Sequence, residues 1–167
     1  WTGHTTREHP SLDRARAAGI ATAVVPHAGK TREAFDAEVD AALRAADAEL
    51  VVLAGFMRIL SDGFVRGWEG RLINIHPSLL PAYKGIKVHE RVIAAQETKS
   101  GASVHFVVPE LDAGPVIAQA SVPVHPSDTP QILADRVLAV EHTLYPEALK
   151  LLASGKVKLQ NGLAVFA

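Results

Sequence analysis

Apolar residues follow two patterns along this chain, a helical periodicity and short continuous runs. These patterns predict helices alternating with strands. Over residues 11–18 and 31–46, apolar residues recur at intervals of three and four, as on one face of a helix. Ser11 and Thr31 are suitable N-caps for these helices, because their hydroxyls can accept hydrogen bonds from free backbone N–H groups. The apolar run over 20–25 predicts a strand between them.

The middle of the chain predicts the strands of one sheet. The continuous apolar run over 50–54 indicates a central parallel strand that is covered on both faces. A short helix over 61–68 leads to a strand over 72–76, which completes a right-handed βαβ connection. Residues 102–108 and 116–124 predict an antiparallel pair, so the sheet should be mixed.

The rest of the chain is predicted to be helical up to a terminal hairpin. One helix ends near Gln96, and a long helix begins with Ser127 or Asp128 as its N-cap. Pro146 lies inside the long helix and should bend or break it. Asn161-Gly162 joins two short β-rich segments, which is typical of a hairpin.

These elements predict an α/β fold with an open, mixed, mainly parallel sheet flanked by helices and a C-terminal β-hairpin. The chain of 167 residues is 48% hydrophobic and contains no repeat, low-complexity tract or linker. We therefore expect one domain over residues 1–167 with a sizeable core.

Charge and cysteine content exclude several classes of function. Seventeen basic and 18 acidic residues give a net charge of −1, so no global field recruits nucleic acid or an anionic membrane. Without cysteine there is no disulfide framework, thiolate nucleophile or cysteine metal site. No apolar run reaches transmembrane length and the start does not look like a signal peptide. We expect a cytoplasmic monomer or homodimer that acts on small molecules.

The strand over 72–76 carries the first candidate chemistry. Asn74 and His76 point to the same side, because side chains alternate faces with period two. Pro77 should end the strand and leave both at its carboxyl end, where open α/β sheets bind ligands. By itself, however, a histidine before a proline is more often a turn residue.

Asp112 is the second candidate, in the loop 110–115. Together with Asn74 and His76 it supplies a carboxamide, an imidazole and a carboxylate, which are the parts of an acyl-transfer site. Its ordinary role would be to form the turn before Gly114 and Pro115. Spacing alone does not bring Asp112 to His76.

A metal hydrolase is an alternative that would use some of the histidines and this aspartate. Its candidate ligands are His76, His89, His105 and Asp112. Their spacing matches no His-x-x-x-His or similar ligand pattern, so we expect no metal.

Five blocks of the chain resemble the folate-dependent formyltransferases, in that family's order and spacing. They are residues 51–60, 74–81, 101–107, 111–117 and 141–146. The resemblance covers most of the chain and implies a Rossmann-like formyltransferase fold. It also implies transfer of a formyl group from 10-formyltetrahydrofolate, the cosubstrate, to the amine of glycinamide ribonucleotide in purine biosynthesis.

The resemblance assigns roles residue by residue. Its catalytic triad falls on Asn74, His76 and Asp112. Folate binding falls on Met57, Arg58, Ile59, Leu60, Val107 and Asp112, and substrate binding on Gly55, Pro77, Ser103, His105 and Glu141. Without the resemblance, Ser103 would be an ordinary strand hydroxyl, Glu141 an exposed helix carboxylate and Arg58 a solvated loop charge.

Two related activities remain as alternatives. A 10-formyltetrahydrofolate hydrolase would use the same three residues with water as the acceptor. A methionyl-tRNA formyltransferase would need an additional basic RNA-binding domain, which this sequence does not show.

The chain departs from the family in two places. Family members open with a strand, a glycine-rich phosphate loop and a helix, whereas residues 1–10 contain one glycine. We therefore expect the 167-residue sequence to lack its natural N-terminal βαβ part and phosphate loop. Residues 84–89 also differ from close relatives, within a loop expected to contact substrate.

Overall fold

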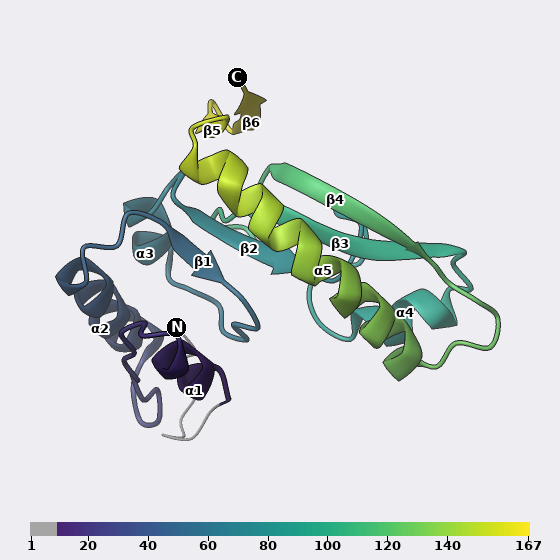
Figure 1. Cartoon of the computed structure of the whole chain (residues 1–167), viewed down its shortest axis with the longest axis horizontal. Helices are drawn as coiled ribbons and strands as arrows, with labels where there is room; N and C mark the ends of the chain where they lie inside the picture. Colours follow the sequence, from purple (N-terminus) through teal and green to yellow (C-terminus); the bar gives the residue numbers. More distant parts are fainter. Residues whose placement is uncertain (1–9) are drawn as a thin grey trace.

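The computed structural model describes residues 10–167 as a sheet with helices on both sides and a separate two-stranded ribbon (Figure 1). In chain order the helices and strands are α1 Pro10–Ala17, α2 Arg32–Ala45, β1 Val51–Leu53, α3 Asp62–Gly67, β2 Leu72–His76, α4 Val88–Ala94, β3 Lys99–Phe106, β4 Val116–Pro123, α5 Pro130–Ala153, β5 Val157–Gln160 and β6 Leu163–Phe166.

The four-stranded sheet has the order β1-β2-β3-β4 and is mixed, as predicted. β1 is parallel to β2, and β3 is antiparallel to both of its neighbours. Among the described residues one of these three pairings is parallel, so the parallel share is smaller than the sequence indicated. β1 also lies at an edge of this sheet, and Val52 and Leu53 are accordingly only partly buried.

Two apolar clusters lie on opposite faces of β2, because neighbouring side chains of a strand point in opposite directions. Leu72 packs in the cluster with Phe35 of α2 and Trp68 after α3. Ile73 packs in the other cluster, with Val104 of β3 and residues of α4 and α5. α5 crosses the sheet on that side (Figure 1). Beyond Leu72 the first face becomes polar, and the candidate site lies there.

The N-terminal helices form as predicted, but the strand between them does not. α1 begins at Pro10, so Ser11 lies inside the helix rather than capping it. Thr31 caps α2 by accepting a hydrogen bond of 3.2 Å from the backbone three residues on. Within the described chain no β ladder reaches residues 20–25, and an extended run without a paired neighbour is no strand. Only Val25 of this run is buried.

The long helix α5 begins one residue later than predicted. Thr129 is its N-cap, while Asp128 binds the guanidinium of Arg136 at 2.5 and 2.9 Å. Pro146 does not break the helix, which continues over 24 residues. Buried residues before and after the proline hold both halves against the sheet, and this packing compensates for the backbone hydrogen bond that proline cannot donate.

The remaining elements follow the predictions closely. Ser61 caps α3, which connects the parallel strands β1 and β2. β3 and β4 pair antiparallel, and α4 ends at Ala94, slightly before the predicted Gln96. The β5–β6 ribbon turns through Asn161 and Gly162, whose φ angles of 50° and 73° suit a type I′ hairpin.

The expected absence of a phosphate loop concerns residues 1–10, of which residues 1–9 lie outside the described part of the chain. Over residues 10–167 no helix has both the length and the apolar composition needed to cross a membrane.

The hydroxyl of Tyr145 ties α5 to the sheet, and its removal should destabilise the fold. It donates to the carbonyl oxygens of Leu53 at 2.6 Å and Ile73 at 3.1 Å. Tyr145→Phe leaves these partly buried acceptors without their donor, so we expect a loss of about 1–3 kcal/mol in the free energy of unfolding. Urea denaturation measures this loss.

Tyr83→Phe is the matched control, because the Tyr83 hydroxyl donates to the carboxylate of Glu97 at an exposed position. Its effect on the free energy of unfolding should stay within about 0.5 kcal/mol. Equal stability of Tyr145→Phe and the unmodified protein would contradict the role given to the Tyr145 hydroxyl.

Candidate functional site

Strands β2, β3 and β4 place the polar side chains of the site in two rows on one face of the sheet. In the first row Asn74 lies opposite His105. In the second row His76 lies opposite Ser103, and Ser103 lies opposite Gln119. Directly opposite residues share a face, with their Cβ atoms about 5 Å apart. The pairing therefore brings together residues that are far apart in sequence.

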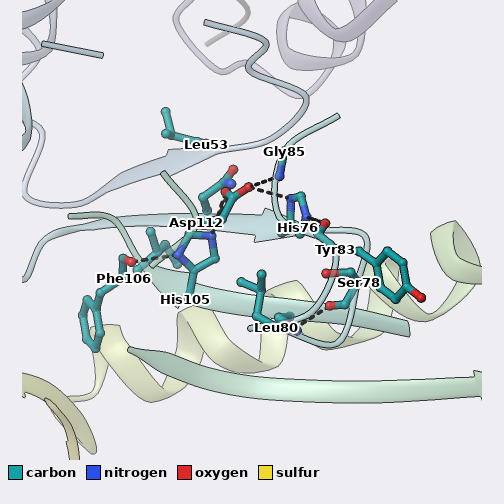
Figure 2. A network of polar contacts seen from close by, with 12 residues as sticks. Leu53, His76, Ser78, Leu80, Tyr83, Gly85, His105, Phe106 and Asp112 are labelled. Carbon is teal, nitrogen blue, oxygen red and sulfur yellow. Dashed lines mark hydrogen bonds and ion pairs between the residues drawn. The ribbon is translucent and has the colours of Figure 1, made fainter. Parts of the chain in front are cut away.

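Asp112 reaches these rows from the loop between β3 and β4. Its φ of +47° lies in the left-handed region, which aspartate tolerates better than most residues. Gly114 is packed so closely that a Cβ atom there would lie 1.7 Å from the Phe106 carbonyl oxygen. The Gly85 N–H donates to Asp112 Oδ2 at 2.8 Å. Two loops thus hold the carboxylate over the polar face (Figure 2).

The structure joins Asp112 to His76, which spacing alone could not show. Asp112 Oδ2 lies 3.4 Å from His76 Nδ1, and the two side chains are 8% and 7% exposed. His76 Nε2 donates to the Tyr83 carbonyl at 2.9 Å. Both ring nitrogens face oxygen acceptors, so the imidazolium form can donate from both of them. The pair can therefore hold a positive charge or pass a proton toward the carboxylate.

His105 is arranged as a neutral ring that orients Asn74. Its Nδ1 donates to the Phe106 carbonyl at 2.8 Å, which leaves Nε2 as an acceptor. Burial lowers the pKa of His105, although the Phe106 carbonyl and Asp112 act in the opposite direction. Asn74 Nδ2 lies 3.5 Å from His105 Nε2 and donates to it. The second N–H of the Asn74 carboxamide can then donate to a ligand.

Large apolar side chains are exposed on the loops that border this polar face. Each of four is more than half exposed, namely Met57, Ile59, Ile86 and Leu111. Ile86 and Leu111 are the chain neighbours of the two residues joined by the hydrogen bond between Gly85 and Asp112. A few convergent polar groups with apolar surface around them are typical of a small-molecule site.

The other residues predicted to bind folate or substrate are placed unequally. Gly55 turns the chain after β1 with φ +63°, and Pro77 follows β2. Arg58 stacks its guanidinium 4.8 Å above an aromatic ring of α2. Val107 is partly buried beside the core, but Leu60 is buried within it. The Leu60 side chain therefore belongs to the core and not to the exposed surface of the loop.

Ser103 lies in the second row, but its hydroxyl has no hydrogen-bonding capacity left. Oγ donates to the Ser78 carbonyl at 2.6 Å and accepts from Leu80 N at 3.0 Å and Gln119 Nε2 at 2.8 Å. A hydroxyl has one proton and two lone pairs, so all three positions are filled. Ser103 is also fully buried. Direct substrate binding by Ser103 therefore does not fit this arrangement.

Glu141 lies on α5, and no hydrogen bond or ion pair joins it to the catalytic candidates among the described residues. Burial raises the pKa of its carboxyl group. Tyr145 lies one helical turn later on the same side and contacts the carbonyls at the ends of Leu53 and Ile73. This contact places the Glu141 side of α5 toward the strands that lead into the site.

Sequence patterns missed three contributors to the site. Gln119 could have been noticed, because period-two alternation on its strand places it beside Ser103 once the strands are paired. The Tyr83 carbonyl and the Gly85 N–H act through the backbone, so their residue types give no signal.

The described residues contain no ligand set for the metal hydrolase considered as an alternative. Over residues 10–167 no group of three or more histidine, aspartate or glutamate side chains is arranged to hold a metal ion. His89 does not join His76 and His105 in such a group.

Known proteins are similar to this chain over most of its length. A curated relative from Bos taurus, "Trifunctional purine biosynthetic protein adenosine-3", is 50% identical over 153 residues, which are 90% of this chain and 15% of that protein. The Escherichia coli "Phosphoribosylglycinamide formyltransferase" is 46% identical over 92% of this chain and 73% of its own length. The chain thus spans a small part of the trifunctional relatives and about three quarters of the bacterial one.

Solved structures of formyltransferases and related enzymes also resemble this chain. The phosphoribosylglycinamide formyltransferase of Coxiella burnetii superposes with a TM-score of 0.90 at 44% identity, over 97% of this chain and 77% of that one. A formyltetrahydrofolate deformylase from Pseudomonas syringae is more distant, at 30% identity and TM-score 0.88, over 95% and 53%. The sequence profile described as "Formyl transferase" matches residues 5–149. The chain therefore belongs to the formyl transferase family.

Proposed function

We propose that this chain transfers the formyl group of 10-formyltetrahydrofolate to the amine of glycinamide ribonucleotide. The observation that carries the proposal is the buried pair of His76 and Asp112 beside the Asn74 carboxamide. The similarity to enzymes named for this reaction supports the choice of acceptor. Purine biosynthesis is the process that such a reaction serves.

The reaction requires stabilisation of an oxyanion and transfer of one proton. The acceptor amine attacks the formyl carbon, and the carbonyl oxygen takes up the negative charge. When the carbonyl forms again, the bond from the formyl carbon to folate N10 breaks. N10 then takes up a proton while the amine loses one, so no external acid or base is consumed.

Asn74 is the donor best placed to meet the oxyanion. One N–H of its carboxamide is directed to His105, and the other is left for the formyl oxygen. Because His105 holds the carboxamide in one orientation, the donor is preorganised before charge develops. Preorganised donors of this kind are a large contribution to acyl-transfer catalysis.

His76 and Asp112 supply charge and proton transfer. Since both ring nitrogens of His76 face protein oxygens, we assign the ring a cationic role near the oxyanion rather than a free N–H donor. Asp112 provides the counter-charge and can accept a proton from the amine, directly or through a water molecule. These assignments use no covalent intermediate.

Glu141 is proposed to bind the acceptor amine. A half-buried carboxyl group with a raised pKa gains most from a positively charged partner, because the partner offsets the cost of burying the anion. Its place on α5, one turn before Tyr145, turns it toward the ends of β1 and β2.

The folate is proposed to lie on the loops after β1 and β3. Met57 and Ile59 offer exposed apolar surface for a flat ring, and Gly55 and Arg58 belong to the same loop. The segment from Val107 to Asp112 forms the opposite wall in this proposal. Leu60 would support the loop from the core, since its side chain is buried.

We further propose one catalytic domain that acts in the cytoplasm on small molecules, as a monomer or homodimer and without nucleic acid, membrane or metal. A net charge of −1 supports the small-molecule assignment, because it gives no field to attract a polyanion.

The proposed function is tested by measuring products with and without the acceptor. With both substrates the protein should produce formylated glycinamide ribonucleotide and tetrahydrofolate in equal amounts. Release of free formate at a similar rate without any amine would instead identify a hydrolase, which would overturn the proposed acceptor.

Asn74→Ala and His76→Ala should each reduce kcat by about 10²-fold or more, because their interactions strengthen as the oxyanion forms. The KM for 10-formyltetrahydrofolate should change much less. Steady-state rates give both values, with the exposed His125→Ala as a control. A variant that keeps near-native kcat would remove its residue from the proposed mechanism.

Asp112→Asn should lower kcat while the site keeps its shape, since the amide is nearly isosteric but uncharged. The amide oxygen can still accept from Gly85 N, so folding should be little affected. Asp135→Asn, an exposed change on α5, is the control. Full activity of Asp112→Asn would show that the negative charge beside His76 is not needed.

His105 should stay neutral to a lower pH than an ordinary histidine, because burial lowers its pKa from the ordinary value of 6.5. As the pH falls below 6.5, the unfolded chain takes up a proton that folded His105 excludes, so stability should decrease. Ring ¹⁵N chemical shifts should show the proton on Nδ1 throughout. A titration midpoint at or above 6.5 would contradict this assignment.

A further inference from the structure

The segment between β2 and α4 is held at three backbone groups by two side chains of the neighbouring strands. Ser103 Oγ accepts from Leu80 N at 3.0 Å and donates to the Ser78 carbonyl at 2.6 Å. Gln119 Nε2 donates to the Leu80 carbonyl at 2.8 Å and also to Ser103 Oγ at 2.8 Å. Leu80 is therefore fixed at both its N–H and its carbonyl.

The same segment supplies the acceptor for His76. Ser78 is fully buried, and its Oγ donates to the Ala82 carbonyl at 2.6 Å. The next carbonyl, that of Tyr83, accepts from His76 Nε2 at 2.9 Å. Hydrogen bonds thus run from Gln119 through Ser103 and Ser78 to Ala82, and the next residue in the chain, Tyr83, holds the histidine ring.

This acceptor decides which nitrogen of His76 faces the carboxylate. Because the Tyr83 carbonyl can only accept, Nε2 must carry a proton, and Nδ1 is the nitrogen that exchanges a proton with Asp112. If the segment moved, Nε2 would lose its partner and the ring could adopt the other tautomer or rotate away.

We propose that Ser103 and Gln119 are positioning residues that hold the 78–83 segment and thereby fix the tautomer and orientation of His76. The proposal rests on the function proposed above and deepens it. It gives Ser103 a role different from substrate binding, because the hydroxyl is already saturated. It also gives Gln119, on the outer strand β4, a role in holding His76, which its own hydrogen bonds do not reach.

Two variants and two matched controls test the proposal. Ser103→Ala removes the hydroxyl, and Gln119→Leu removes both donors with little change in volume. Ser100→Ala is the control on the same strand, since Ser100 is buried and its Oγ has no hydrogen-bond partner among the described residues. Gln160→Leu makes the glutamine change on the separate β5–β6 ribbon. Circular dichroism first identifies the temperature range in which each variant is folded.

Ser103→Ala and Gln119→Leu should each lower kcat by about tenfold or more, because small misplacements of a catalytic group are costly. Both KM values should stay within about twofold, since neither residue contacts substrate. In the neutral form of the His76 ring, after Nδ1 has given its proton to Asp112, the ring ¹⁵N shifts should move from those of the Nε2–H tautomer toward those of a mixture of tautomers. The double variant should be no slower than the slower single variant, because both changes release the same segment. The two controls should behave as the unmodified protein.

Several results would overturn the proposal. A folded Gln119→Leu with unchanged kcat and unchanged His76 shifts would do so, as would a Ser103→Ala that raises KM alone, which indicates a ligand. If Ser103→Ala does not fold, the kcat and His76 shifts of Gln119→Leu, a change on the outer strand β4, still test the proposal. If the unmodified protein lacks transferase activity, the proposed function fails, but the His76 shifts still decide the positioning role.

Discussion

The arrangement of the site depends on one buried carboxylate. Asp112 must be compensated wherever it lies below the surface, because an unpaired buried anion is far more costly than a paired one. The Gly85 N–H and the imidazole of His76 provide that compensation. His105 lies beside the carboxylate, with Nε2 3.8 Å from Asp112 Oδ1, but its neutral ring offers no proton there. The two partners come from a loop and from β2, so placing this charge fixes one strand and two loops relative to one another.

The two imidazoles beside this carboxylate have different tasks because their other nitrogens meet different surroundings. His105 is fully buried and donates to a carbonyl of its own strand, which favours a neutral ring. His76 lies at the end of β2 with acceptors at both nitrogens, which suits a ring that carries charge. The same residue type on one face of a sheet thus serves once as a fixed acceptor and once as an acid.

The sequence predicted the strands of the site and the shared face of Asn74 and His76, because period-two alternation is local information. It could not place Asp112, whose approach depends on close packing at Gly114 and on a backbone N–H. Saturation of the Ser103 hydroxyl was equally hidden, since it needs three partners from other segments. Outside the site, residues 20–25 had strand composition but no strand beside them, which composition cannot reveal.

Every hydrogen bond and ion pair described between the polar rows, Asp112 and the 78–83 segment lies within residues 74–119. α2 packs instead through Phe35, in the apolar cluster that also holds Trp68 and Leu72. Native proteins open in separate cooperative units of unequal stability. An opening of α2 alone would break none of the hydrogen bonds that assemble the triad, and the amide protons of β2 and β3 would exchange with solvent only in rarer and larger unfolding events.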